Sequence, residues 1–133
     1  MSDDAFMGRT AQRGYRVVAQ DLAGALGSGD VPVLATPRLI AWLEAATVDA
    51  VADALTEGTT TVGTAIEVDH VAPSPEGASV TVSATVSSRE GSLLRFDCEA
   101  VQAHADGSTT IIAHGSIARA VVDRARFLAR LQG

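Results

Sequence analysis

The stretch from Thr36 to about Leu55 places apolar residues at helical spacing and predicts the longest helix of the chain. Thr36 can cap the free N–H groups of the first turn, and Pro37 fits a helix start. At about 100° per residue, Glu44 falls on a mostly apolar face. That face holds Ile40, Thr47, Val48, Val51 and Leu55. A carboxylate on a core-facing stripe is costly to ionise unless it is paired, so Glu44 is a candidate functional residue.

After Gly58 the hydrophobic periodicity changes from helical to alternating, which predicts antiparallel strands with one face exposed to solvent. Turn-forming residues separate the four expected strands, which lie at 60–70, 79–87, 93–105 and 109–122. Another strand at 10–18 and a loop at 20–33 precede the helix, and a short helix at 123–131 ends the chain. Residues 1–133 form a single domain, with a loose tail expected at 1–8.

One long helix packed on a curved antiparallel sheet is an α+β arrangement, and the order of elements predicts the hotdog fold. A chain of 133 residues buries enough surface to fold without a disulfide or metal staple. A sheet of this size leaves edge strands open, and pairing two sheets edge to edge covers them. We therefore expect a homodimer, with higher assembly left open.

Two further ionisable residues fall on apolar faces. In the strand 60–70, strict alternation places His70 on an inward row, which it shares with Val62, Thr64, Ile66 and Val68. In the last strand, Arg119 shares a face with Ile111, Ala113, Ile117 and Val121. An unpaired buried charge is expensive, and Glu44, His70 and Arg119 can satisfy one another if the fold brings them together.

Composition excludes several classes of function. The formal net charge is −6, which argues against nucleic-acid binding, although the basic residues are all arginines and suit a local anion site. Cys98 is the only cysteine, which suits a reducing compartment. The chain shows no membrane-length apolar run and starts with an acidic segment unlike a signal peptide, so a cytoplasmic protein is expected. The three histidines lack metal-ligand spacing, so no metal site is expected.

Several motifs in register resemble the fluoroacetyl-CoA thioesterase-like branch of the hotdog thioesterases. The matching pieces are Thr36 with Glu44 eight residues later, Gly63-Thr64-Ala65-Ile66-x-Val68-x-His70, Pro75-x-Gly77 and Arg119-Ala120-Val121. The resemblance covers roughly residues 31–130 in the same order. The Gly-Thr-Ala-Ile-x-Val-x-His block is the most specific of these motifs.

The resemblance implies a role for each matching residue. Thr36, Glu44 and His70 match the catalytic set, Gly63 matches a glycine lining the substrate end of the pocket, and Arg119 matches an arginine of the surrounding polar network. The family hydrolyses acyl-CoA thioesters as a homodimer with active sites near the subunit interface. It uses no metal or prosthetic group, so coenzyme A enters only as part of the substrate. A carrier-protein thioester is the alternative substrate.

Three questions stay open at the sequence level. The fluoroacetyl specialist carries an aromatic lid before its catalytic threonine, whereas Leu22–Val33 contains no aromatic residue, which favours a short or medium acyl group instead. Glu44 can attack the thioester directly or activate water. The rival functions are a non-catalytic acyl-CoA-binding module and an enoyl-CoA hydratase, whose longer Asp/His motif is not found here.

Overall fold

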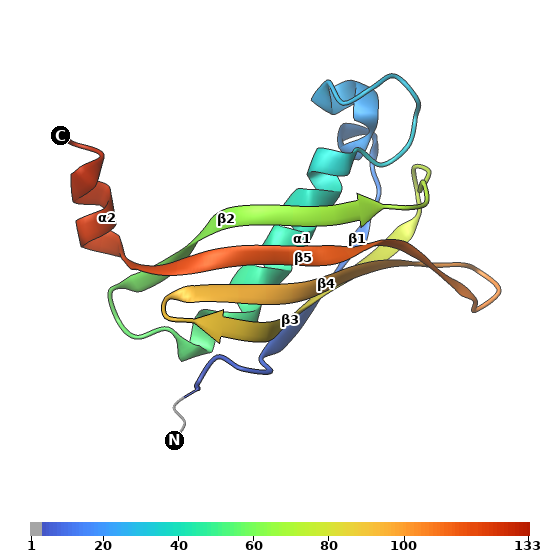
Figure 1. Cartoon of the computed structure of the whole chain (residues 1–133). Helices are drawn as coiled ribbons and strands as arrows, with labels where there is room; N and C mark the ends of the chain where they lie inside the picture. Colours follow the sequence, from blue (N-terminus) through green and yellow to red (C-terminus); the bar gives the residue numbers. More distant parts are fainter. Residues whose placement is uncertain (1–3) are drawn as a thin grey trace.

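One long helix crosses one face of a five-stranded antiparallel sheet in the computed structural model, which describes residues 4–133 (Figure 1). The strands are β1 (Thr10–Arg16), β2 (Thr59–His70), β3 (Ser79–Glu90), β4 (Leu93–Ala103) and β5 (Thr109–Asp123). The helices are α1 (Thr36–Val51) and α2 (Arg124–Arg130), with short 3-10 turns η1 (Ala19–Asp21), η2 (Ala23–Leu26) and η3 (Ala52–Ala54). The expected order of elements is confirmed, with small shifts at their ends.

The strand order β1-β3-β4-β5-β2 leaves β1 and β2 at opposite edges of the sheet. All four pairings are antiparallel. Although β2 follows α1 directly in the chain, it pairs with β5, the last strand. The segment that carries Gly63 and His70 therefore lies on an open edge.

The core lies between α1 and the inner face of the sheet. Its fully buried side chains include Leu39, Leu43, Val82, Leu94 and Phe96. Burying a side chain of this size contributes about 1.5–3 kcal/mol, so the helix is held mainly by packing. Trp42 adds a stacked contact with Tyr15 of β1, with ring centroids 4.3 Å apart. This packing fixes which face of α1 meets the sheet.

Glu44 lies at the rim of the buried stripe of α1, not at its centre. Its side chain is 35% exposed, and Val48, on the same side of the helix, is also exposed. The stripe is centred near Leu43, about 100° around the helix from Glu44. The expectation that Glu44 faces the core is therefore wrong, by about the 100° that one residue turns around a helix.

A β-bulge in β2 changes which of its side chains face the helix. The register with β5 shifts between Gly63 and Ala65, so Thr64 is the extra residue. An inserted residue reverses the alternation on one side of it. Thr61 and Gly63 therefore face inward, whereas strict alternation had assigned Val62 and Thr64 to the inner row.

The start of the chain packs against the sheet from Phe6 onward. Phe6 is buried, and the guanidinium of Arg89 lies 5.1 Å above its ring. The N–H of Gly8 donates to the carbonyl of Val86 at 3.1 Å. Residues 1–3 of the expected loose tail lie outside the described residues, but its second half is not loose.

We expect Gly115→Ala to lower the free energy of unfolding by roughly 2 kcal/mol or more. Gly115 has φ 157°, and a Cβ there would collide with the carbonyl oxygen of Glu67 and lie 2.7 Å from Cα of Val68. Urea unfolding measures the loss. Gly14→Ala in β1 is the matched control, because a Cβ there meets nothing within 4 Å. Equal stability of the two variants would contradict the close approach of β5 to β2.

Candidate active site

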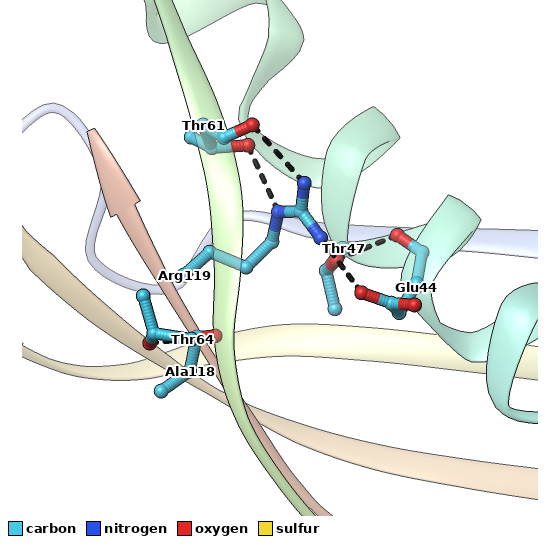
Figure 2. Close-up of polar contacts among 6 residues, drawn as sticks. All are labelled: Glu44, Thr47, Thr61, Thr64, Ala118 and Arg119. Atoms are coloured by element: carbon cyan, nitrogen blue, oxygen red, sulfur yellow. Dashed lines mark hydrogen bonds and ion pairs between the residues drawn. The ribbon is translucent and has the colours of Figure 1, made fainter. Parts of the chain in front are cut away.

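Arg119 joins β2 to the carboxylate of Glu44 on α1 (Figure 2). Its Nη1 donates to Oε2 of Glu44 at 3.2 Å. Its Nε donates to the hydroxyl of Thr61 at 2.9 Å, and its Nη2 donates to the carbonyl of Thr61 at 3.1 Å. Arg119 is only 8% exposed, so these partners supply the hydrogen bonds that a buried guanidinium needs.

The ion pair occupies only one oxygen of the Glu44 carboxylate. Oε2 accepts from Arg119, whereas Oε1 has no hydrogen-bond partner among residues 4–133. The hydroxyl of Thr47 donates to the backbone carbonyl of Glu44 at 2.6 Å and so leaves the carboxylate free. Glu44 therefore presents one oriented, unpaired oxygen.

Gly63 gives the carboxylate room to lie against β2. A Cβ at this position would stand 2.8 Å from Oε2 of Glu44 and 3.4 Å from Nη1 of Arg119. Glu44 and Gly63 line an open pocket of about 360 Å³ together with Thr64, Ala65 and Ile66. The glycine is thus required by space at the site.

Thr36 and His70 form a second group. The hydroxyl of Thr36 lies 2.8 Å from Nδ1 of His70, which is the last residue of β2. Ala35 occupies the N-cap position of α1, and no side chain caps this end of the helix. The expected capping role of Thr36 is therefore wrong, because its hydroxyl bonds the imidazole instead.

Burial shapes the proton chemistry of His70. Desolvation lowers the pKa of its imidazole from 6.5, and the nearby backbone of Ala72 opposes this shift more weakly. The ring is therefore neutral at neutral pH. Its Nε2 is buried without a partner in the described part of the chain. A neutral imidazole with one nitrogen held by Thr36 and the other unpaired is suited to proton transfer.

Residues 22–33, which we call the lid segment, cover the Thr36–His70 pair. They contribute Ala23, Ser28 and Val33 to a pocket of about 270 Å³ that Thr36 and His70 also line. Asp21 fixes both ends of the lid segment. Its carboxylate accepts from the N–H of Val18 at 2.9 Å, and its carbonyl accepts from the N–H of Ala35 at 2.8 Å.

Arg38 adds a charged contact at the base of the lid segment. Its Nε lies 3.0 Å from Oδ1 of Asp21, which is an ion-pair distance, although the angle does not meet that of a hydrogen bond. Asp21 is itself buried. The first turn of α1 is therefore tied to the neck of the lid segment.

The two groups do not meet within one chain. Thr36 and Glu44 are eight residues apart on α1, which is about 12 Å along the helix. Of the three inward ionisable residues, Glu44 and Arg119 satisfy each other, and His70 pairs with Thr36. The sequence analysis did not identify Thr61. Strict alternation placed it on the outer face of β2, whereas the bulge at Thr64 turns it inward.

Among residues 4–133, no group of three or more His, Cys, Asp or Glu side chains lies close enough together to hold a metal ion. No helix in this part of the chain is long and apolar enough to cross a membrane.

Comparison with known proteins decides the family. The family model described as fluoroacetyl-CoA-specific thioesterase, FlK, matches residues 17–125. The chain belongs to this family. A structure of the fluoroacetyl-CoA thioesterase FlK is 30% identical, with a TM-score of 0.83 over 95% of this chain and 94% of that one. A search of curated proteins found no match.

More distant structures agree on the fold. A hot-dog-like protein from Thermanaerovibrio acidaminovorans is 23% identical, with a TM-score of 0.85 over 98% of this chain and 93% of that one. A variant of 4-hydroxybenzoyl-CoA thioesterase is 11% identical, with a TM-score of 0.72 over 85% and 84%. The hotdog fold is thus confirmed, and the family assignment confirms a thioester hydrolase.

We expect His70 to titrate below pH 6.5, because burial disfavours its charged form. NMR titration of the ring protons measures the pKa, with His70→Asn used to assign the signal. The unfolded chain then takes up a proton at higher pH than the folded chain, so stability should fall as pH drops below about 6.5. His70→Asn should weaken this dependence of stability on pH. His104→Asn, at an exposed position, should leave the contribution of His70 in place. A His70 pKa above 6.5 would contradict the burial of the ring.

Proposed function

We propose that this protein hydrolyses acyl-CoA thioesters with short or medium acyl groups in a homodimer. Each active site combines Glu44 of one protomer with Thr36 and His70 of its partner. The observation that carries this proposal is the placement of the two groups along one open edge strand. Glu44 of α1 lies against Gly63 of β2, and His70 lies at the end of that strand.

The edge formed by β2 favours pairing with a second copy. Residues 63–67 are exposed, and Ile66 is 47% exposed although its neighbours in the sheet are buried. Val48 is exposed on the adjoining side of α1. An edge strand of twelve residues with apolar side chains is a strong template for strand addition. A second β2 strand would satisfy the free backbone groups and cover both apolar residues.

Twofold symmetry would bring the two groups together. In an isologous pair of antiparallel strands, residues equally distant from the axis lie opposite each other. An axis between Ile66 and Glu67 is midway between Gly63 and His70. It would place His70 of one protomer opposite Gly63 of its partner, beside Glu44. This arrangement supports a site that neither protomer completes alone.

The residues of such a site can perform thioester hydrolysis. The free oxygen of Glu44 acts on the carbonyl, either by attacking it or by taking a proton from a water that does. The carbon–sulfur bond then breaks, and hydrolysis gives a carboxylic acid and the free thiol. His70 passes to the departing sulfur a proton that comes from the water consumed in the hydrolysis, and Thr36 holds the imidazole in position through Nδ1. Arg119 orients the carboxylate.

The lid segment supports the choice of acyl group. Its pocket-lining residues, Ala23, Ser28 and Val33, are small or aliphatic, which leaves space above Thr36. A mutant of the fluoroacetyl-CoA-specific thioesterase FlK has been solved in complex with fluoroacetate and CoA, which supports CoA as the carrier. We therefore propose acyl-CoA substrates wider in range than the fluorinated one.

We expect Glu44→Gln and His70→Ala each to lower kcat by roughly 10²- to 10⁴-fold, because each removes a group that transfers protons or attacks the carbonyl. Release of free thiol from acyl-CoA substrates of increasing chain length provides the measurement. Glu90→Gln is the matched control, because it removes the same charge at an exposed position on β3, away from the β2 edge. Undiminished turnover in Glu44→Gln would overturn the assignment.

We expect mixed dimers of Glu44→Gln and His70→Ala to regain activity. A mixed dimer holds one site with both residues intact, so random mixing should give roughly a quarter of wild-type activity. The two variants are unfolded together in urea, refolded and assayed for thiol release. Mixing each variant with itself is the control. Failure to regain activity, with mixed dimers verified by mass spectrometry, would show that one protomer supplies the whole site.

A further inference from the structure

The C-terminal segment reverses the charge of the rest of the chain. Residues 124–133 contain three arginines and no acidic residue. The remaining 123 residues hold seven arginines against sixteen acidic residues. All three C-terminal arginines, Arg124, Arg126 and Arg130, lie on α2. A concentration of positive charge on an acidic protein marks a local site for an anion.

Helix α2 continues from β5 and stands clear of the sheet, near the end where β2 begins (Figure 1). Arg126 and Arg130 are four residues apart, so they share one face of the helix. Together with Phe127 they line a hollow of about 200 Å³. Arg124 lines a neighbouring pocket of about 400 Å³. Arg124 thus borders one hollow, and Arg126 and Arg130 border another on a different side of α2.

No acidic side chain in the described residues forms a salt bridge with these arginines. Asp123 lines the smaller hollow, but its Oδ1 accepts from the N–H of Arg126 at 2.8 Å and caps α2. Glu57 lines the larger pocket without pairing with Arg124. None of the three arginines is therefore held in a salt bridge among residues 4–133, and three positive charges face two acidic neighbours, Asp123 and Glu57.

The larger pocket connects α2 with the active site. One part of its lining is Thr61, which holds Arg119, and Val48, one helical turn beyond Glu44. Another part is Arg124. Between them lie aliphatic side chains, threonine side chains and the backbone at Gly58. Such a lining suits a flexible chain that carries both methyl and amide groups.

The distances fit the length of a pantetheine arm. From Arg119 to Arg124 the chain advances five residues, about 17 Å at strand spacing. The pantetheine chain of roughly thirteen atoms equals about four extended residues, or about 14 Å. An arginine side chain easily spans the difference. A thioester beside Glu44 would therefore place its phosphates at α2.

We infer that the pocket between Val48 and Arg124 holds the pantetheine arm of the substrate, and that Arg124, Arg126 and Arg130 bind the phosphates of the CoA nucleotide. Guanidinium groups are the preferred donors to phosphate, and Phe127 offers an apolar surface for the adenine ring. The inference rests on the proposed function, because it assigns the carrier to the same site. It makes CoA the carrier, in place of a carrier protein.

The triple variant Arg124→Gln/Arg126→Gln/Arg130→Gln tests the inference. We expect its KM for acyl-CoA to rise about tenfold with kcat unchanged, because each exposed contact contributes a few-fold. KM for the same acyl group on pantetheine, which lacks the nucleotide, should not change. The matched control, Arg9→Gln/Arg13→Gln/Arg16→Gln, removes the same charge from exposed positions on or beside β1, the edge opposite β2, and should match wild type on both substrates.

Other results would overturn the inference. An unchanged KM for acyl-CoA would do so, as would an equal rise for acyl-pantetheine or in the control variant. A defect seen only with an acyl carrier protein would assign the arginines to a protein surface. If wild type releases no thiol from any acyl-CoA, the proposed function fails separately. Calorimetry with free CoA and with pantetheine then still tests whether the arginines bind phosphate. The inference requires that CoA bind wild type more tightly than it binds the triple variant.

Discussion

The guanidinium of Arg119 is the constraint on which the site depends. It is buried between sheet and helix, so its donors must find acceptors inside the protein. Thr61 provides two of them from β2, and Glu44 provides the third from α1. This set of bonds fixes the distance and orientation between the strand and the helix at the point where the carboxylate lies. The bulge at Thr64 is part of the same arrangement, since it turns both Thr61 and Gly63 toward the helix.

Much of this could be predicted from the sequence. Periodicity alone identified Glu44, His70 and Arg119 as ionisable residues near apolar faces, and alternation located the strands. The errors have physical causes. The polarity pattern predicts that Glu44 lies on the buried face of α1. In the structure that face is centred near Leu43, so Glu44 lies at its edge. Strict alternation failed at the bulge, because one inserted residue reverses every side chain beyond it. No local pattern showed that Thr36 would bond His70 rather than cap α1.

The separation of the Glu44–Arg119 pair from the Thr36–His70 pair could not be predicted from the sequence, for a different reason. Motif spacing records which residues occur together in a family, but it does not say whether they come from one chain. Here the hydroxyl–imidazole pair and the carboxylate–guanidinium pair are each complete within a protomer. Each pair is therefore stabilised by folding alone, and association would determine only their relative position.

Asp21 has a consequence for how such enzymes diverge. Its backbone and carboxylate hold the neck of the lid segment to Val18, Ala35 and Arg38. Between these anchors, residues 24–32 are exposed. Surface loops of this kind tolerate insertions and substitutions better than the elements they connect. In the proposed site, substrate preference would therefore change by exchange of one surface loop, without alteration of Glu44, His70 or the sheet that supports them.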